Sequence, residues 1–216
     1  MTQIRAVIFD MDGVLIDARE WHYQALNKIL DEYGLPISRE AHLTKYDGLP
    51  TRDKLNLLTA HYGLPASSHD RINQMKQHYT MELIEQLCRP VEEHLLLLMQ
   101  LKKQGYSLAV ASNSIRNSIQ SMLSKAGILP FIDFFLSNED VSQGKPSPEI
   151  YLKAIHRLEL TPEECVVVED NPHGIAAARA AGAHVLTVKD PSEVTRSRLL
   201  GFISECEKNS QSSVDK

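Results

Sequence analysis

The sequence is poor in cysteine. Only Cys88, Cys165 and Cys206 occur among its 216 residues, and no two of them form a C-x-x-C pair. An odd number of scattered cysteines disfavours a disulfide framework or a zinc site and fits a reducing compartment. We therefore expect a cytoplasmic protein.

Long apolar runs and an excess of basic charge are also absent. The densest aliphatic stretch is Leu95–Met99, whereas a membrane span needs about 20 apolar residues. The N-terminus shows neither the cationic flank nor the cleavage site of a signal peptide. The formal net charge of −5 offers no positive field for nucleic acid. We therefore expect neither a membrane nor a polynucleotide as a partner.

The composition that is present is that of a globular protein. Apolar residues make up 43% of the chain and charged residues 24%, which is enough to bury a full core in one domain, or in one domain with a small insertion. We expect a monomer. The polar, Ser-rich end from about Glu207 to Lys216 predicts a frayed tail.

The first apolar stretch predicts a strand that ends in carboxylates. Residues Ala6–Phe9 are apolar, and Asp10, Asp12 and Gly13 follow. In an extended segment residues i and i+2 point to the same side, so the two aspartates face one small volume. A Mg²⁺ ion, a proton on one carboxylate, or a phosphate with its metal would relieve their repulsion. A strand followed by a plain Asp-Gly turn is the alternative interpretation.

The next part of the chain is helical. Apolar residues recur at helical spacing in Arg19–Tyr33, from about Arg52 to Tyr62 and from about His69 to Leu87. No strand pattern interrupts them. Residues 18–90 therefore predict a small α-helical domain inserted directly after the first strand.

From Leu95 onward, helices alternate with short apolar strands. The predicted strands are 107–111, 134–136, 165–168 and 184–188. This alternation predicts an α/β fold, a doubly wound parallel sheet with a Rossmann-like core formed by residues 1–17 and 91–216. Because the helical insertion follows the first strand end, we expect it to lie over the ligand crevice as a cap.

Chemically capable residues follow three of the predicted strands. In open parallel sheets the ligand crevice lies beyond the carboxyl ends of the strands, so these residues predict one site. They are Asp10 with Asp12, Ser112 with Asn113, and Glu169 with Asp170.

The carboxylates suit phosphoryl transfer. Asp10 can act as a nucleophile that takes a phosphoryl group, and Asp12 is placed to protonate the leaving oxygen and later to deprotonate water. Asp170 would supply a further carboxylate for Mg²⁺, supported by Glu169 through water. A helix-capping pair at Glu169 and Asp170 is the structural alternative.

Two further residues complete the predicted chemistry. Ser112 can hydrogen-bond a phosphoryl oxygen, and an ammonium at Lys145 would stabilise the charge of the transferring group. Taken alone, each residue more often has a structural role, Ser112 as a strand-end hydrogen bonder and Lys145 as a solvated loop residue.

Together and in this order, four segments resemble the four motifs of the haloacid dehalogenase-like phosphotransferases. They are Phe9–Val14, Ala111–Asn113, Gly144–Tyr151 and Val168–Asn171. The resemblance implies a Mg²⁺-dependent phosphatase or phosphomutase that acts on a small phosphorylated metabolite through an aspartyl phosphate. It also implies Asp10, Asp12, Asp170 and Glu169 as the residues around the metal. The presence of Asp12 argues against dehalogenase chemistry, because the dehalogenases of the family lack this second aspartate.

The insertion point of the helical block resembles the subclass with an α-helical cap after the first motif, and within it the β-phosphoglucomutase-like phosphatases. The loop Gly48–Arg52 resembles a substrate-reading loop, in which Arg52 would meet a non-transferring anionic group. His22 matches a position that contacts the general acid in mutases of this subgroup. One departure is Pro90-Val91, where the family usually has Pro-Gly at the cap hinge.

Other polar residues are candidates for binding the substrate. Lys76 and Arg116 could reach a substrate phosphate, and Asn113 lies next to Ser112. Solvated helix faces, and a cap-packing role for His22, are the structural alternatives.

We expect a phosphatase rather than a mutase. Arg52 follows Gly48 by four positions, whereas in the mutase version the arginine follows the glycine by three. A sugar phosphomutase of the β-phosphoglucomutase type remains the alternative. A catalytically weak binding protein of the same fold is the non-enzyme alternative.

Overall fold

A computed structural model describes residues 3–46 and 48–212. The chain divides into two compact units, Met1–Asp17 with Arg89–Lys216, and Ala18–Cys88. The sequence predicts an inserted domain at residues 18–90. In the structure the second unit ends at Cys88, two residues earlier.

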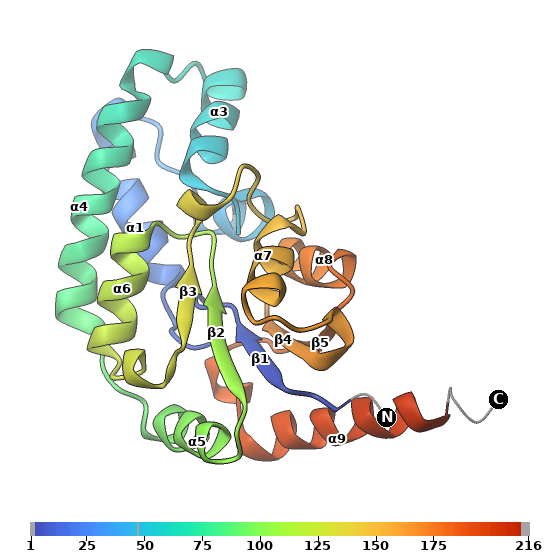
Figure 1. Cartoon of the computed structure of the whole chain (residues 1–216). Coiled ribbons are helices and arrows are strands. Elements are labelled where there is room, and N and C mark those ends of the chain that lie inside the picture. Colours follow the sequence, from blue (N-terminus) through green and yellow to red (C-terminus); the bar gives the residue numbers. More distant parts are fainter. Residues whose placement is uncertain (1–2, 47, 213–216) are drawn as a thin grey trace. The chain divides into compact units, whose positions relative to one another are not determined.

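A parallel sheet forms the centre of the first unit (Figure 1). Within the described residues its strands are β1 (Ala6–Phe9), β2 (Ser107–Ala111), β3 (Phe134–Leu136), β4 (Cys165–Glu169) and β5 (His184–Thr187). Every neighbouring pair is parallel, and the order is β3-β2-β1-β4-β5. The predicted doubly wound, Rossmann-like sheet is confirmed.

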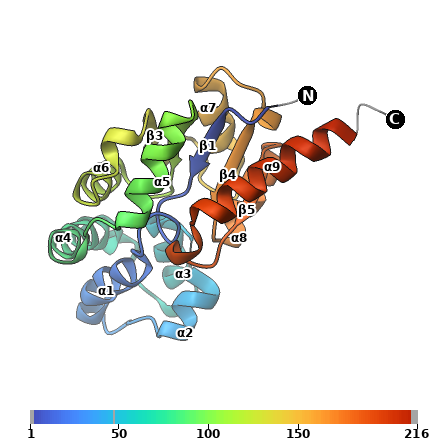
Figure 2. The same cartoon turned by 90° about the horizontal axis from the view of Figure 1, so that it is seen from below.

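Helices cover both faces of this sheet. They are α5 (Glu92–Lys103), α6 (Arg116–Lys125), α7 (Glu149–Arg157), α8 (Pro172–Ala180) and α9 (Arg196–Ser212). Tyr151 and Ala154 of α7 and Ala177 of α8 share one buried cluster with Ile8 and Val167 of the sheet. Figure 2 shows α5 and α9 crossing the other face. Because both faces are covered, the central strands are apolar without alternation.

The end of the chain differs from the sequence prediction. Residues from Glu207 to Ser212, predicted as part of a frayed tail, continue helix α9, and residues 213–216 lie outside the described part. The helix persists because Leu199, Ile203 and Cys206 recur at helical spacing and are buried. In addition, Glu207 Oε1 accepts a hydrogen bond from the Ile4 backbone N–H (3.0 Å), just before β1.

The second unit is helical in all its described regular elements, as the sequence predicts. Its longer helices are α1 (Arg19–Leu30), α3 (Thr51–Tyr62) and α4 (His69–Leu87), with α2 (Arg39–Ala41) and a π-helical turn (His42–Tyr46) between the first two. Leu26, Ile29, Leu55 and Ile72 belong to one buried cluster that joins the three longer helices. The unit therefore has its own core. Asp47, inside the predicted cap, lies outside the described residues.

No helix within residues 3–46 and 48–212 combines the length and the apolar character that crossing a membrane requires.

The carboxylate of Glu149 closes the loop before α7. It accepts hydrogen bonds from the backbone N–H groups of Ser142 (2.9 Å) and Gln143 (2.9 Å) and pairs with Lys153 one turn later (2.8 Å). The hydrogen bond from Lys153, together with those from the two backbone amides, lowers the pKa of Glu149 to about 2. Glu149 thus ties the loop that carries Lys145 to the first turn of α7.

We expect Glu149→Gln to destabilise the protein in a pH-dependent way. The folded-state pKa of about 2 lies below the ordinary value of 4.5, so the ionised carboxylate contributes its full stabilisation above the ordinary value and loses it as the pH falls toward the folded value. Urea denaturation at a series of pH values should therefore show a gap between wild type and variant that is constant above pH 5 and shrinks below it. Glu205→Gln, on the exposed side of α9, is the control for loss of one charge. A gap of the same size at pH 7 and pH 3 would contradict the assignment.

Candidate active site

The sheet brings the predicted residues together at the carboxyl ends of its central strands. Phe9 of β1 pairs with Val110 of β2 and with Val168 of β4, so these three strands end level with one another. The Asp10 backbone N–H continues the ladder to Val168 O (3.0 Å), and the Ser112 N–H continues it to Leu136 O (3.1 Å). The side chains that follow the three strands therefore lie next to each other.

Lys145 is the buried cation at this edge. Its Nζ donates hydrogen bonds to Asp10 Oδ1 (2.6 Å), Glu169 Oε1 (2.7 Å) and Ala111 O (2.9 Å). The side-chain amide of Asn113 fixes its backbone, since Asn113 Oδ1 accepts the Lys145 N–H at 3.0 Å. Only 5% of Lys145 is exposed, so its charge acts in a region from which water is largely excluded.

The charges of this cluster perturb one another strongly. Burial raises the pKa of Asp10 well above its ordinary value; Lys145 opposes this shift, and Glu169, Asp170 and Asp12 add to it. Burial alone would lower the pKa of Lys145, but Asp10 and Glu169 raise it above its ordinary value, so Lys145 remains an ammonium. Such perturbed pKa values in a cluster of carboxylates and a lysine are typical of a functional site.

Glu169 is held from four directions. Its Oε1 accepts from Lys145 and from the Tyr151 hydroxyl (2.6 Å), and its Oε2 accepts from the backbone N–H groups of Asp170 (3.0 Å) and Asn171 (3.2 Å). Four donors match the accepting capacity of one carboxylate. The structure therefore gives Glu169 the geometry of a support that orients Lys145 and the segment carrying Asp170.

Gly174, in the first turn of α8, leaves the room that Glu169 occupies. A Cβ atom at position 174 would lie 1.7 Å from Glu169 Oε1 and 2.4 Å from Oε2, distances that no pair of non-bonded atoms can adopt. Gly174 was not predicted as a site residue, because nothing in a helical Ala-rich pattern marks which small residue faces a carboxylate.

The carboxylate oxygens fit a divalent cation. One oxygen each from Asp10, Glu169 and Asp170 lie within 4.8 Å of one another, and hard oxygen ligands of this kind are those that Mg²⁺ prefers. Of the four residues predicted around the metal, three are thus in one cluster. Within the described residues Asp12 is not part of this cluster, and its side chain faces the serines that follow β2.

Asp12 contacts two of these serines. The Ser114 hydroxyl donates to Asp12 Oδ2 at 2.8 Å, and the Ser112 hydroxyl approaches the same oxygen at 3.4 Å. Ser112 Oγ in turn accepts the Ser114 backbone N–H at 3.0 Å. Ser114 was not predicted as a site residue. The available signal was its place two residues after Ser112, a spacing at which a serine hydroxyl can accept the backbone N–H and turn the chain, as it does here.

Arg116, predicted to reach a substrate phosphate, is engaged elsewhere in the structure. Its guanidinium pairs with Asp140 and lies 5.4 Å from the centre of the Phe135 ring. The amide of Asn113, likewise predicted to bind substrate, accepts a hydrogen bond from the Lys145 backbone N–H. Both contacts join loops of the first unit, and spacing along the sequence could not reveal either partner.

In the second unit, two of the three predicted substrate-binding residues touch each other. Lys76 Nζ of α4 lies 3.1 Å from His22 Nδ1 of α1; because an ammonium can only donate, Nδ1 is the acceptor. The side chain of Arg52, in the first turn of α3, is 80% exposed and lies 3.6 Å from the Asp53 carboxylate. Its guanidinium is therefore largely open to solvent.

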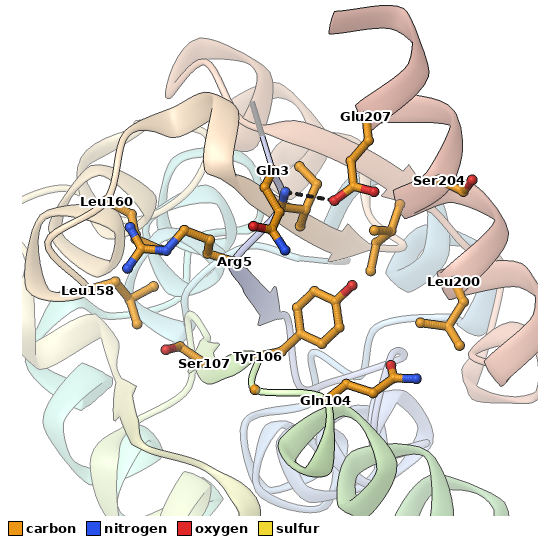
Figure 3. A pocket seen from close by; sticks show the side chains of 13 residues that line it. Gln3, Arg5, Gln104, Tyr106, Ser107, Leu158, Leu160, Leu200, Ser204 and Glu207 are labelled. Atoms are coloured by element: carbon orange, nitrogen blue, oxygen red, sulfur yellow. Dashed lines mark hydrogen bonds between the residues drawn. The ribbon is translucent and has the colours of Figure 1, made fainter. Parts of the chain in front are cut away.

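A separate cavity lies at the opposite, amino edge of the sheet (Figure 3). It has a volume of about 520 Å³ and is lined by residues that include Arg5, Tyr106, Leu200 and Glu207. None of the predicted site residues lines it. The candidate active site is thus distinct from this cavity.

Known proteins with a similar sequence or structure agree with this fold. Residues 7–188 match the family model described as haloacid dehalogenase-like hydrolase. The chain belongs to this family.

Individual relatives are consistent with that membership. The chain is 31% identical over 182 residues to a phosphorylated carbohydrates phosphatase from Thermotoga maritima, covering 83% of this chain and 82% of that protein. It is 29% identical over 195 residues to β-phosphoglucomutase from Bacillus subtilis, covering 86% and 83%. The crystal structure of β-phosphoglucomutase from Clostridium difficile, at 24% identity, has the same fold, with a TM-score of 0.82 over 94% of this chain and 98% of that one. These relatives support the predicted enzyme class, a phosphatase of this family with a phosphomutase as the alternative.

We expect Gly174→Ala to lower the free energy of unfolding by about 1–3 kcal/mol, the usual cost of forcing an extra group into a packed site. The physical reason is the collision of the new methyl group with the Glu169 carboxylate. Urea denaturation in the presence of a chelator measures the effect on the metal-free protein.

The matched control is Gly201→Ala in α9, where a Cβ meets nothing within 4 Å. This substitution should leave stability unchanged or raise it by about 0.5–1 kcal/mol, because alanine favours a helix over glycine. Equal effects of the two substitutions would contradict the packing described here.

Proposed function

We propose that this protein is a Mg²⁺-dependent phosphatase that hydrolyses a small phosphorylated metabolite through an aspartyl phosphate on Asp10. The observation that carries the proposal is the contact of 2.6 Å between the buried Lys145 ammonium and Asp10 Oδ1. Transfer of a phosphoryl group to the protein requires a nucleophilic carboxylate and, next to it, a fixed cation that stabilises the charge of the transferring group.

The first step would transfer the phosphoryl group to the protein. A carboxylate oxygen of Asp10 attacks phosphorus while the bond between phosphorus and the leaving oxygen breaks, and Asp12 gives its proton to that oxygen. Lys145 stabilises the negative charge on the transferring group. Ser114 keeps Asp12 oriented through its hydrogen bond of 2.8 Å.

The second step would regenerate the enzyme. Asp12, now a carboxylate, takes a proton from water as the water oxygen attacks phosphorus, and Asp10 leaves as a free carboxylate with release of inorganic phosphate. Asp10 and Asp170 would hold the Mg²⁺ ion, with Glu169 close by. When bound, the ion neutralises charge on the carboxylates and the phosphoryl oxygens.

The class of substrate is supported by the relatives. The protein from Thermotoga maritima is named for phosphorylated carbohydrates, which favours a sugar phosphate or a similar phosphate monoester here. We further propose that residues 18–90 act as a cap that selects the substrate, with Arg52, His22 and Lys76 among its contacts. The cytoplasmic location and the monomeric state remain predictions from the sequence.

A phosphomutase is the second candidate. The presence of His22 and Lys76 favours it, because the family resemblance assigns the His22 position to contact with the general acid in mutases. Mutase and phosphatase would share the aspartyl phosphate and differ in whether a sugar phosphate or water attacks it.

The first test concerns the nucleophile. With Mg²⁺ and a chromogenic phosphate monoester we expect slow, saturable hydrolysis that disappears in Asp10→Asn, because an amide cannot take up the phosphoryl group. A chelator should abolish the activity, and added Mg²⁺ should restore it.

Asp70→Asn, on the exposed surface of α4, is the matched control and should retain wild-type activity. Undiminished hydrolysis by Asp10→Asn would rule out the aspartyl-phosphate mechanism, and no hydrolysis by the wild type of any ester in a broad panel would favour a binding protein.

The second test separates phosphatase from mutase. When the enzyme is incubated with β-glucose 1-phosphate and a trace of the 1,6-bisphosphate, we expect release of inorganic phosphate or no reaction. The readouts are a phosphate assay and a coupled assay for glucose 6-phosphate. Stoichiometric formation of glucose 6-phosphate without phosphate release would make the mutase the correct assignment.

A further inference from the structure

Tyr151 of α7 contacts both Lys145 and Glu169, which form a buried ion pair in the candidate active site. Its hydroxyl donates to Glu169 Oε1 at 2.6 Å, and the same oxygen accepts from Lys145 Nζ at 2.7 Å. Lys145 Nζ also lies 4.8 Å from the centre of the Tyr151 ring. The side chain is fully buried and therefore shielded from bulk solvent.

Lys145 is shared between two carboxylates. Its distances to Asp10 and Glu169 are almost the same, 2.6 and 2.7 Å, and only the contact with Asp10 places the ammonium at the proposed nucleophile. A second donor to Glu169 Oε1 weakens the hydrogen bond between that oxygen and Lys145, because both donors share the negative charge of one carboxylate oxygen. The hydroxyl of Tyr151 is in the position to do this.

We propose that Tyr151 is a positioning residue, whose hydroxyl orients the Glu169 carboxylate so that the Lys145 ammonium is directed at Asp10. This inference rests on the proposed function, since it assigns Lys145 to the transferring group. Tyr151 acts through its contacts with Glu169 and Lys145.

The hydroxyl can be removed without removing the ring. In Tyr151→Phe the stack on Lys145 is kept, whereas Glu169 Oε1 loses one donor and draws the ammonium away from Asp10. We expect kcat for phosphate-ester hydrolysis to fall by about tenfold, with KM changed less than twofold, because the ammonium stabilises charge that develops in the transition state. Tyr106→Phe, a tyrosine in the cavity at the amino edge of the sheet, is the matched control and should leave kcat unchanged.

A double-mutant cycle tests whether Tyr151 acts through Glu169. In the Glu169→Gln background, Tyr151→Phe should have little further effect on kcat, because the carboxylate that the hydroxyl orients is already gone. An equal fall of kcat in both backgrounds, or an unchanged kcat in the Tyr151→Phe single variant, would overturn the positioning role.

The same four proteins also provide a test without catalysis. In the presence of a chelator, the shifts of the urea denaturation midpoint caused by Tyr151→Phe and Glu169→Gln should be strongly non-additive, as expected for two partners of one buried hydrogen bond. Additive shifts would overturn the inference even if Glu169→Gln is inactive. If the wild type hydrolyses no phosphate ester while the midpoints are non-additive, the proposed function fails and, with it, the assignment of Lys145, whereas the hydrogen bond from Tyr151 to Glu169 stands.

Discussion

The rest of the site depends on two buried ion pairs that share Lys145, one with Asp10 and one with Glu169. Placing an ammonium and two carboxylates away from water is unfavourable unless each charge finds partners. Removing one partner of such a buried group typically costs about 3–5 kcal/mol. The surrounding elements are arranged so that Lys145 Nζ has three acceptors and Glu169 has four donors. Lys145, Asp10, Glu169 and Tyr151 therefore form one connected polar network at the carboxyl ends of an apolar sheet.

Each secondary-structure element around the network contributes one specific constraint. The level ends of β1, β2 and β4 place Asp10 and Glu169 side by side. Helix α7 supplies the Tyr151 hydroxyl, and the first turn of α8 supplies a glycine where any Cβ would strike a carboxylate. Such a network is favourable only when its members have hydrogen-bond partners. A change at any of these positions should therefore alter the position or the hydrogen bonds of Lys145.

Much of this arrangement could be predicted from the sequence, but not which side chains form hydrogen bonds or ion pairs with one another. Alternating apolar strands and helices specify a parallel sheet, and polar residues after three strands specify the edge where Asp10 meets Glu169. Spacing along the chain does not say which hydroxyl reaches a carboxylate, so Ser114 and Tyr151 were not predicted. For the same reason the pairing of Arg116 with Asp140 could not be predicted. The end of α9 was predicted as part of a frayed tail from its polar composition, whereas three buried residues earlier in the helix anchor it.

The residues proposed for phosphoryl transfer all belong to the unit built on the parallel sheet, whereas His22, Lys76 and Arg52 belong to the helical unit with its own core. The central network uses backbone amides, a tyrosine and a glycine, none of which recognises a particular sugar or alcohol. The contact between His22 and Lys76 lies outside that network, and the Arg52 side chain is largely exposed. In the proposed mechanism, a change of preferred substrate, or of the group that attacks the aspartyl phosphate, could therefore arise in the helical unit without disturbing the buried charges assigned to the transfer.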